Sequence, residues 1–321
     1  MAEGTGRARL LRRLRNALPV AVTVAAFAWL LSGDQIDLGR AFRAVGPGPP
    51  LQLLAVAVVY VAISLGIEVR SLIRVAGLPR ERFAPATAAR IKCASYLAYT
   101  IHYSLGVGAL SILLQRRAQL ALSDAAGVVL LIAAFDLGQT LLVATTGLLM
   151  IGTDLQALRA GVIVGGGVAI VGGFALLRAP VSLGPLERLR ELRLFRAARE
   201  TPLPRVAELF VLRLGFVLWF FTVTAVALRL FGVAPPLPVL FVNVSLVVLI
   251  GAVPIAVAGL GTSNAAFVYL FRDYADEDTL FVCSLALWMF LILLRASLGL
   301  VFAREYAREA IEAARLEQEE V

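Results

Sequence analysis

Charged residues are scarce in this sequence, and their scarcity argues against a soluble fold. Asp, Glu, Lys and Arg make up 16% of the 321 residues, whereas a soluble domain carries about 25%. Hydrophobic residues make up 60%, and the mean hydropathy is +0.86. Several stretches of roughly 15–25 residues are almost uncharged, which is about the length that a helix needs to cross a bilayer. They do not alternate between polar and apolar residues, so they predict helices rather than the strands of a barrel.

Histidine and cysteine are also scarce, which narrows the possible chemistry. His102 is the only histidine, so a histidine-based metal cluster is excluded. The two cysteines, Cys93 and Cys283, stand apart in apolar surroundings and make neither a disulfide framework nor a metal site. The sequence has no P-loop and no Ser–His–Asp set. We therefore expect no cofactor, no metal and no enzymatic activity.

Arginine supplies nearly all of the positive charge: 29 Arg and one Lys give a net charge of +8. The arginines lie between the apolar stretches, as the positive-inside rule predicts for cytoplasmic loops, and this argues against nucleic-acid binding. Five Arg precede the first apolar stretch, and no small-x-small cleavage site follows it. The sequence thus predicts a multi-pass protein of the cell (inner) membrane with a cytoplasmic N-terminus.

Six helical spans and two interrupted apolar regions are predicted. The spans lie at about 17–31, 51–67, 123–147, 157–177, 206–231 and 279–302. The interrupted regions are 86–117, broken by Gly106 and Gly108, and 239–271, broken by Pro254, Gly259 and Gly261. The distribution of Arg fits one topology only if each interrupted region enters and leaves on the same side as a re-entrant hairpin. The alternative is that the hairpins cross as short spans, which gives eight crossings.

The two interrupted regions resemble one another. With an offset of 153 residues, Gly106 falls on Gly259 and Gly108 on Gly261. We therefore expect an all-α membrane bundle of two inverted repeats, each with three spans and one hairpin, as in many transporters. Residues 1–178 hold the first repeat and the span that opens the second, and residues 206–302 hold the rest of the second.

Two charged segments lie outside the repeats. Residues 179–205 form a basic cytoplasmic linker, in which 184–200 predicts an amphipathic interfacial helix; the alternative is a solvated linker that only sets orientation. Residues 303–321 form a charged cytoplasmic tail, predicted as a short exposed helix from Arg304 to Glu320.

Charge inside a predicted span marks a candidate site, because burying it is costly. Asp136 lies near the middle of 123–147, and Arg213 and Arg295 each lie about two turns inside a span. We expect Asp136 to pair with Arg213 or Arg295 at the centre of the bundle. The alternatives are an ion pair that only fixes packing and arginines that extend to the cytoplasmic interface.

The hairpin glycines are the second candidate site. A half-helix that begins in the membrane presents free N–H groups and a helix dipole to an anion such as a phosphate headgroup. The residues predicted to bind it are Gly106, Gly108, Gly259, Gly261, Thr262, Ser263 and Asn264. The alternative is that these glycines only allow close helix packing.

Further polar residues are expected to assist or to pack. Glu68, Arg70, Arg74, Arg90 and Lys92 cluster at the predicted cytoplasmic entrance, where they either steer anionic headgroups or only set the topology. Asn243, in an apolar stretch, is expected to make an interhelical hydrogen bond.

Two stretches carry a resemblance to a known family. Tyr103–Gly108, with Leu113–Arg117 and Leu122–Ala125 after it, resembles one half of the lysylphosphatidylglycerol synthase transmembrane (flippase-like) family. The Pro and Gly-Leu-Gly of Val253–Gly261 resemble the other half. The resemblance implies a polytopic inner-membrane protein that moves aminoacylated or isoprenoid-type lipids between leaflets. The aminoacyl-transferase domain of some members is absent from this sequence, so synthesis of the lipid is not expected.

This sequence departs from the family at charged positions. Ala109 and Ile112 stand where the family has Glu and Arg after the first hairpin, and Ala133 stands near the place of an Arg before Asp136. Asn264 replaces the Glu that follows Gly-Leu-Gly. Either the headgroup differs from that of the better-known members or transport has been lost.

Three functions are therefore weighed. The first is a translocator of an anionic, aminoacylated or isoprenoid-type lipid. The second is a non-transporting scaffold or partner subunit of a lipid-modifying enzyme, and the third, least favoured, is a membrane-embedded transferase. The expected partners are membrane lipids, with a second copy of the chain or a lipid enzyme as further possibilities.

Overall fold

The computed structural model describes residues 46, 48–79, 81–101, 103–151, 172–178, 187–252 and 261–319. Every regular element within these residues is helical, and they contain no strand. The predicted span 17–31 lies outside them, as does most of 157–177, of which residues 172–177 are helical.

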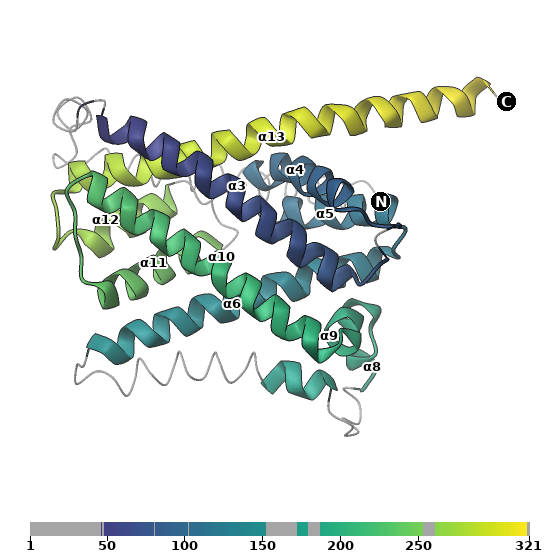
Figure 1. The fold of residues 1–321 in the computed structure, drawn as a ribbon, viewed down its shortest axis with the longest axis horizontal. Coiled ribbons are helices and arrows are strands. Elements are labelled where there is room, and N and C mark those ends of the chain that lie inside the picture. Colours follow the sequence, from purple (N-terminus) through teal and green to yellow (C-terminus); the bar gives the residue numbers. More distant parts are fainter. Residues whose placement is uncertain are drawn as a thin grey trace, which may run out of the picture. The chain divides into compact units, whose positions relative to one another are not determined.

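Four helices are long and apolar enough to cross a membrane (Figure 1). They are α3 (Gly48–Ala76), α6 (Leu122–Ile151), α10 (Leu203–Leu230) and α13 (Glu277–Glu319), the last with its apolar part at Glu277–Ala303. They contain the predicted spans 51–67, 123–147 and 279–302, and α10 covers 206–231 except for its last residue. These four candidate spans indicate a multi-pass membrane protein.

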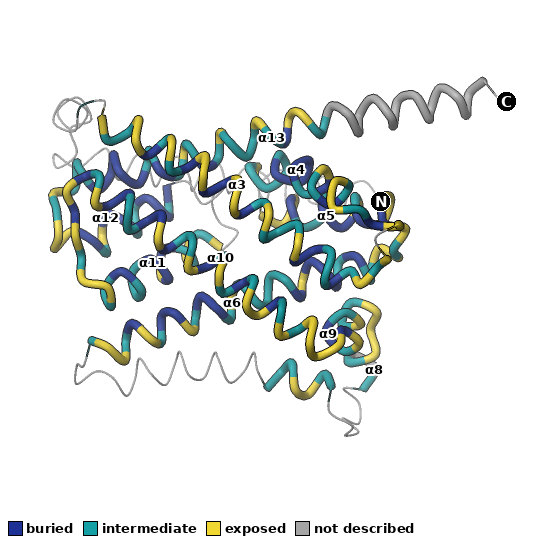
Figure 2. The backbone as a smooth tube through the Cα atoms, in the orientation of Figure 1, coloured by how far each residue is buried: buried dark blue, intermediate teal, exposed yellow. Residues whose placement is uncertain are grey.

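The surface of the long helices suits a bilayer. Large apolar side chains such as Leu51, Val211 and Val301 are more than half exposed, and yellow exposed segments recur along α3, α10 and α13 (Figure 2). In water such exposure would be unfavourable over a large contiguous area, whereas lipid chains cover it at no cost.

Glycine and proline set the ends of the long helices. Helix α3 begins in a Gly-Pro-Pro run, and it ends before Gly77, whose φ of +66° is typical of a residue just beyond a helix end. Helix α10 ends in the same way before Gly232, with φ of +77°. At the start of α13, the Asp276 carboxylate accepts the Thr279 N–H at 2.9 Å, as an N-cap residue does.

Both interrupted regions form pairs of packed helices. Helix α4 (Pro85–Ile101) packs against α5 (Tyr103–Ala118), and α11 (Leu237–Ala252) packs against α12 (Thr262–Phe271). The first interruption was predicted at Gly106 and Gly108, and this is wrong: α4 ends at Ile101, and both glycines lie inside α5. A single glycine lowers helix stability by only about 1 kcal/mol, which packing on a neighbour readily offsets.

The chain divides into two compact units, each containing one of these pairs. The α4–α5 unit consists of α3 from Val58, α6 up to Leu142, α10 up to Phe220 and α13 from Leu291, together with the segment before α10. The α11–α12 unit consists of the other halves of the same four long helices.

The α4–α5 unit has a continuous apolar core. Phe83, Ile91, Leu114 and Leu209 are fully buried in it, with further small and branched residues from α3, α4, α5 and α6. In the α11–α12 unit, aromatic rings contribute to the packing: Phe267 contacts Phe271 and Trp288, with ring centres 4.8 and 6.0 Å apart.

The basic segment before α10 is not the continuous helix expected over 184–200. Within its described part it forms α8 (Glu187–Arg190), a 3₁₀ turn (Arg193–Phe195) and α9 (Arg196–Glu200), with a bend between. The Arg178 guanidinium holds the end of this segment, because it donates to the carbonyls of Ala198 and Thr201 at 2.7 and 2.6 Å. The charged tail, expected as a separate short helix, continues α13 to Glu319.

Candidate functional site

The strongest candidate site is a buried ionic cluster within the α4–α5 unit. Asp136, near the middle of α6, pairs with Arg213 of α10, which donates from both Nε and Nη2 to one carboxylate oxygen. Arg213 is only 2% exposed, and its guanidinium lies 4.0 Å from the centre of the Phe216 ring. The structure thus confirms that Asp136 is paired, and it selects Arg213 over Arg295 as the partner.

A second ion pair joins α3 to α4. Lys92 Nζ lies 3.0 Å from a carboxylate oxygen of Glu68, and both side chains are almost completely buried. Tyr96 donates its hydroxyl to the other oxygen of Glu68. The Lys92 ammonium also lies 4.9 Å from the centre of the Tyr99 ring, within range of a cation–π interaction. Glu68 and Lys92, expected among the charges at the entrance, are therefore part of the buried cluster.

Arg295 of α13 is the third cation of the cluster. Its guanidinium carbon lies 5.7 Å from the centre of the Tyr60 ring and 5.4 Å from that of Tyr96. Among the described residues, no carboxylate lies within 4.0 Å of it. Its Nε is buried without a hydrogen-bond acceptor, so Arg295 is held by aromatic faces rather than by a counter-ion.

These five ionisable groups act on one another as a single electrostatic group. Glu68 interacts with Lys92, Arg295 and Arg213, and Asp136 interacts with Arg213 and Lys92. Three cations face two carboxylates, which leaves one positive charge in excess. Since burial makes an uncompensated charge unfavourable, the cluster is suited to a negatively charged group.

Unpartnered polar atoms collect in the same unit. Within the described part of the chain, buried nitrogen and oxygen atoms without a hydrogen-bond partner belong to Ser64, Asp124, Gln139, Arg213, Trp219 and Arg295. All six residues lie in the α4–α5 unit, and four of the atoms belong to donor groups. Buried polar groups are nearly always satisfied, so their accumulation in one unit distinguishes it from ordinary packing.

The first pair of hairpin glycines does not reach this cluster as free N–H donors. Gly106 lies in the first turns of α5, where a Cβ would come within 2.1 Å of the Tyr99 ring. This is the close packing given above as the alternative to ligand binding. A Cβ on Gly108 would meet nothing within 4 Å, so packing does not require a glycine there.

The second pair of glycines is seen in part, because Gly259 lies outside the described residues. Gly261 is the N-cap of α12 with φ of +85°, a conformation that favours glycine. Its N–H donates to the Asn264 side chain at 3.1 Å, and Asn264 in turn donates to Ser284 at 3.0 Å.

The other polar residues near the start of α12 also make contacts within the fold. Ser263 is 2% exposed and lies against Gly251 of α11, and Thr262 opens α12. Asn243 donates to the Leu270 carbonyl of α12 at 2.6 Å, which confirms its expected interhelical hydrogen bond. Asn243 and Ser263 therefore connect α11 with α12, and Asn264 connects α12 with α13. All three lie in the unit that does not contain the ionic cluster.

The remaining charges of the predicted entrance form a surface network. Arg70 and Arg74 of α3 both contact Glu208 of α10, at 2.7 and 2.9 Å. All three side chains are at least partly exposed, so this network contributes little to stability. Arg90 is exposed as well.

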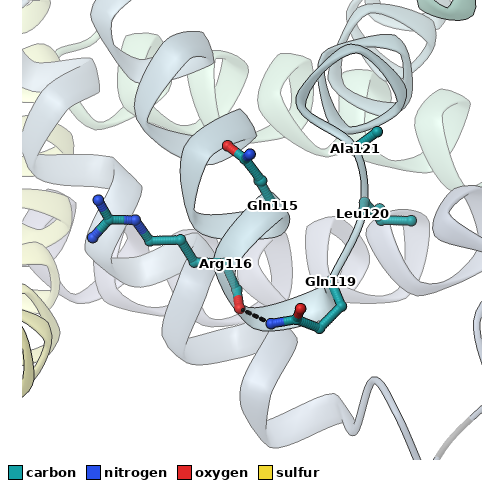
Figure 3. A pocket seen from close by; sticks show the side chains of 5 residues that line it. All are labelled: Gln115, Arg116, Gln119, Leu120 and Ala121. Atoms are coloured by element: carbon teal, nitrogen blue, oxygen red, sulfur yellow. Dashed lines mark hydrogen bonds between the residues drawn. The ribbon is translucent and has the colours of Figure 1, made fainter. Parts of the chain in front are cut away.

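A separate depression of about 550 Å³ lies where α5 turns into α6. Figure 3 shows its lining residues, Gln115, Arg116, Gln119, Leu120 and Ala121. The Gln119 side chain donates to the Arg116 carbonyl at 2.8 Å, and Gln119 has a positive φ of +53°. None of the predicted site residues lines this depression, so it is distinct from the ionic cluster.

Sequence reasoning missed the aromatic and hydroxyl residues of the site. Tyr60, Ser64, Tyr96 and Trp219 carry no charge, so they do not stand out in apolar helices. One signal was available: Lys92, Tyr96 and Tyr99 recur at helical spacing, which places them on one face of α4.

In the described ranges, no three His, Cys, Asp or Glu side chains come together as possible metal ligands. The chain matches no protein-family model, and no curated protein is significantly similar to it.

Proposed function

We propose that this chain is a flippase-like membrane protein that moves a lipid between bilayer leaflets, with the headgroup passing the ionic cluster of the α4–α5 unit. The observation that carries the proposal is the gathering of five ionisable side chains from four candidate spans and the α4 hairpin, among which Arg213 is 2% exposed and Glu68 and Lys92 are 10% and 12% exposed. Charges at membrane depth are costly and typically mark a substrate or ion pathway. A lipid headgroup is the polar group that a bilayer itself supplies.

The hairpins support a transporter architecture. Helix α12 has ten residues, which span about 15 Å, whereas the hydrocarbon core of a bilayer is about 30 Å thick. This length favours a re-entrant α11–α12 hairpin over two crossings. The order long helix, hairpin, long helix occurs twice, as α3, α4–α5, α6 and as α10, α11–α12, α13, which is consistent with the inverted repeat proposed from the sequence.

The division into units supports the same proposal. The α4–α5 pair belongs with the halves of the long helices whose ends carry Arg70, Arg74 and Arg205, the ends assigned to the cytoplasm by the positive-inside rule. The α11–α12 pair belongs with the opposite halves. Each hairpin is thus associated with one predicted side of the membrane.

A second function of another class is favoured by the α11–α12 unit. Asn264 is 0% exposed and uses its side chain within the fold, on Gly261 and Ser284. This internal use suits a non-transporting scaffold or a partner subunit of a lipid-modifying enzyme. Lipid exchange between leaflets distinguishes the two functions, because a translocator accelerates it and a scaffold does not.

The experiment is leaflet exchange in vesicles that contain the purified full chain. A fluorescent anionic, zwitterionic or isoprenoid-type lipid is placed in both leaflets, and an impermeant quencher reports the rate at which inner-leaflet probe reaches the surface. We expect faster exchange than in empty vesicles for at least one lipid, and its loss in Asp136→Asn. The matched control is Asp273→Asn, at an exposed turn, which is expected to leave the rate unchanged. If no lipid is accelerated, the scaffold function replaces this proposal.

A further inference from the structure

We propose that the α4–α5 unit binds the phosphodiester of a lipid whose headgroup carries a single net negative charge, through three donors grouped around Tyr60. This inference names the substrate class and rests on the proposed function for its role in transport. The three donors, called here the donor group, are the Ser64 hydroxyl, the Trp219 indole N–H and the Arg295 guanidinium.

Tyr60 brings the donor group together from three helices. The Trp219 ring of α10 stacks near the Tyr60 ring, with centres 6.5 Å apart and planes inclined by 22°. Arg295 of α13 lies over the same ring at 5.7 Å. Ser64 follows Tyr60 by four residues on α3, so the two side chains lie on one face of that helix, and the side chains of Ser64 and Arg295 both lie close to the Tyr60 hydroxyl.

Each member of the donor group has a buried atom that lacks a partner. Ser64 Oγ, Trp219 Nε1 and Arg295 Nε are all buried and make no hydrogen bond to any described residue, and Ser64 is 0% exposed. Leaving a buried donor unsatisfied is costly. Three such atoms around one ring are therefore a set of donors that a single bound acceptor would satisfy.

Charge decides what the acceptor is. Water can satisfy hydrogen bonds, but it cannot neutralise the excess positive charge of the ionic cluster. That excess belongs to Arg295, because Asp136 is paired with Arg213 and Glu68 with Lys92. A phosphodiester supplies one negative charge and several acceptor oxygens, which matches one unpaired guanidinium and two neutral donors.

The excess positive charge of the cluster also disfavours headgroups that carry a cation. A choline or an aminoacyl ammonium would need a carboxylate, and both carboxylates of the cluster are already engaged by buried cations and by Tyr96. Such a headgroup would bring a further positive charge beside Lys92 and Arg213. The site therefore favours an unsubstituted phosphodiester such as that of phosphatidylglycerol over zwitterionic or aminoacylated lipids.

The test is equilibrium binding of pyrene-labelled lipids to the purified full chain in detergent. We expect phosphatidylglycerol to bind at least about tenfold more tightly than phosphatidylcholine or lysyl-phosphatidylglycerol, since all three carry the phosphodiester but the latter two add a cation, which the excess positive charge of the cluster repels. Arg295→Gln and Trp219→Phe should weaken phosphatidylglycerol binding and reduce the preference. The matched controls Arg272→Gln and Trp288→Phe, both in the α11–α12 unit, should leave it unchanged.

Different results would contradict the binding inference, the assignment to a lipid and the proposed transport. Equal binding of the three lipids, or unchanged binding in both Arg295→Gln and Trp219→Phe, overturns the inference; if Arg295→Gln does not fold, Trp219→Phe and Ser64→Ala decide. Displacement of the pyrene lipid by glycerol phosphate as readily as by unlabelled lipid overturns the lipid assignment in favour of a soluble phosphate ester. Selective binding without leaflet exchange contradicts only the proposed transport, whereas exchange without this preference contradicts only the inference.

Discussion

The ion pair between Arg213 and Asp136 joins two side chains that differ in exposure. The guanidinium is 2% exposed, whereas the Asp136 side chain is 35% exposed. One member of the pair is thus locked in the packing, and the other retains access to whatever enters the unit. Removing either member leaves its partner as an uncompensated charge, which is the most destabilising way to alter a buried pair.

The first prediction concerns this pair. Asp136→Asn and Arg213→Gln are each expected to lower the free energy of unfolding by about 3 kcal/mol, seen as earlier thermal unfolding in detergent. The double variant Asp136→Arg with Arg213→Asp should recover part of the loss, because opposite charges again face each other. A double variant no more stable than the worse single variant would show that the pairing is not the source of the stability.

The second prediction compares two glycines of α5. Gly106→Ala places a Cβ 2.1 Å from the Tyr99 ring, so we expect a loss of about 1–3 kcal/mol from overpacking. Gly108→Ala meets nothing within 4 Å and should stabilise the helix by about 0.5–1 kcal/mol. Thermal unfolding of the two variants checks the opposite signs; equal effects would contradict the packing role of Gly106.

At the scale of elements, α9 and the 3₁₀ turn before it are fixed to the unit by backbone contacts. The Leu194 carbonyl oxygen lies where a Cβ on Gly127 of α6 would come within 2.3 Å. Arg178 holds the carbonyl end of α9, and Arg196 reaches Asp124 at 3.6 Å. The segment therefore depends on a glycine in a neighbouring helix rather than on its own helical propensity.

The third prediction follows from that contact. Gly127→Ala must displace the Leu194 backbone, which we expect to release the segment and to expose its arginines. Limited trypsin digestion of the purified protein should then cut after Arg193, Arg196 or Arg199 several-fold faster than in the unaltered chain. Gly215→Ala, where a Cβ meets nothing within 4 Å, is the matched control, and equal digestion of the two variants would contradict the docking.

Sequence patterns predicted the positions of the long helices but not the breaks between the shorter ones. Apolar length alone located α3, α6, α10 and α13, because a helix exposed to lipid is uniformly apolar. The break before α5 could not be placed from Gly106 and Gly108, since a glycine tolerated in a helix and a glycine that ends one look alike in sequence. The placement of α9 involves the contact of Gly127 with the Leu194 backbone and the hydrogen bonds of Arg178, and both partners are distant in the sequence.

The site was predictable only in its charges. A carboxylate in the middle of an apolar stretch demands a partner, so Asp136 and its pairing with an arginine followed from the sequence. The choice of Arg213 over Arg295 depends on three-dimensional packing. The donor group was not predictable, because Ser64 and Trp219 become unusual only when their polar atoms are seen to be buried without partners.

At the scale of the whole molecule, the balance of charge along the chain assigns the ends of the long helices to two sides. The turn between α10 and α11 contains no basic residue, whereas the end of α5 carries Arg116 and Arg117. Both natural cysteines are buried, so the chain offers a low background for thiol labelling.

The fourth prediction concerns the sides of the membrane on which two turns lie, tested by labelling of introduced cysteines. Ala234→Cys, exposed in the turn after α10, should react with a membrane-impermeant maleimide added to intact cells. Ala121→Cys, exposed in the turn after α5, should react only after permeabilisation. Labelling of both from the same side would contradict the re-entrant α4–α5 hairpin or the assigned orientation.

The most direct measurement of the central claim is whether a lipid headgroup reaches the ionic cluster. Phosphatidylglycerol with a photoreactive headgroup is incorporated into vesicles with the full chain, irradiated, and its attachment points are mapped by mass spectrometry. We expect labelled peptides around Ser64, Trp219 and Arg295, with labelling reduced by unlabelled phosphatidylglycerol. Labels confined to the ends of the helices, and unaffected by that competitor, would show that the headgroup does not enter the α4–α5 unit and would contradict the account.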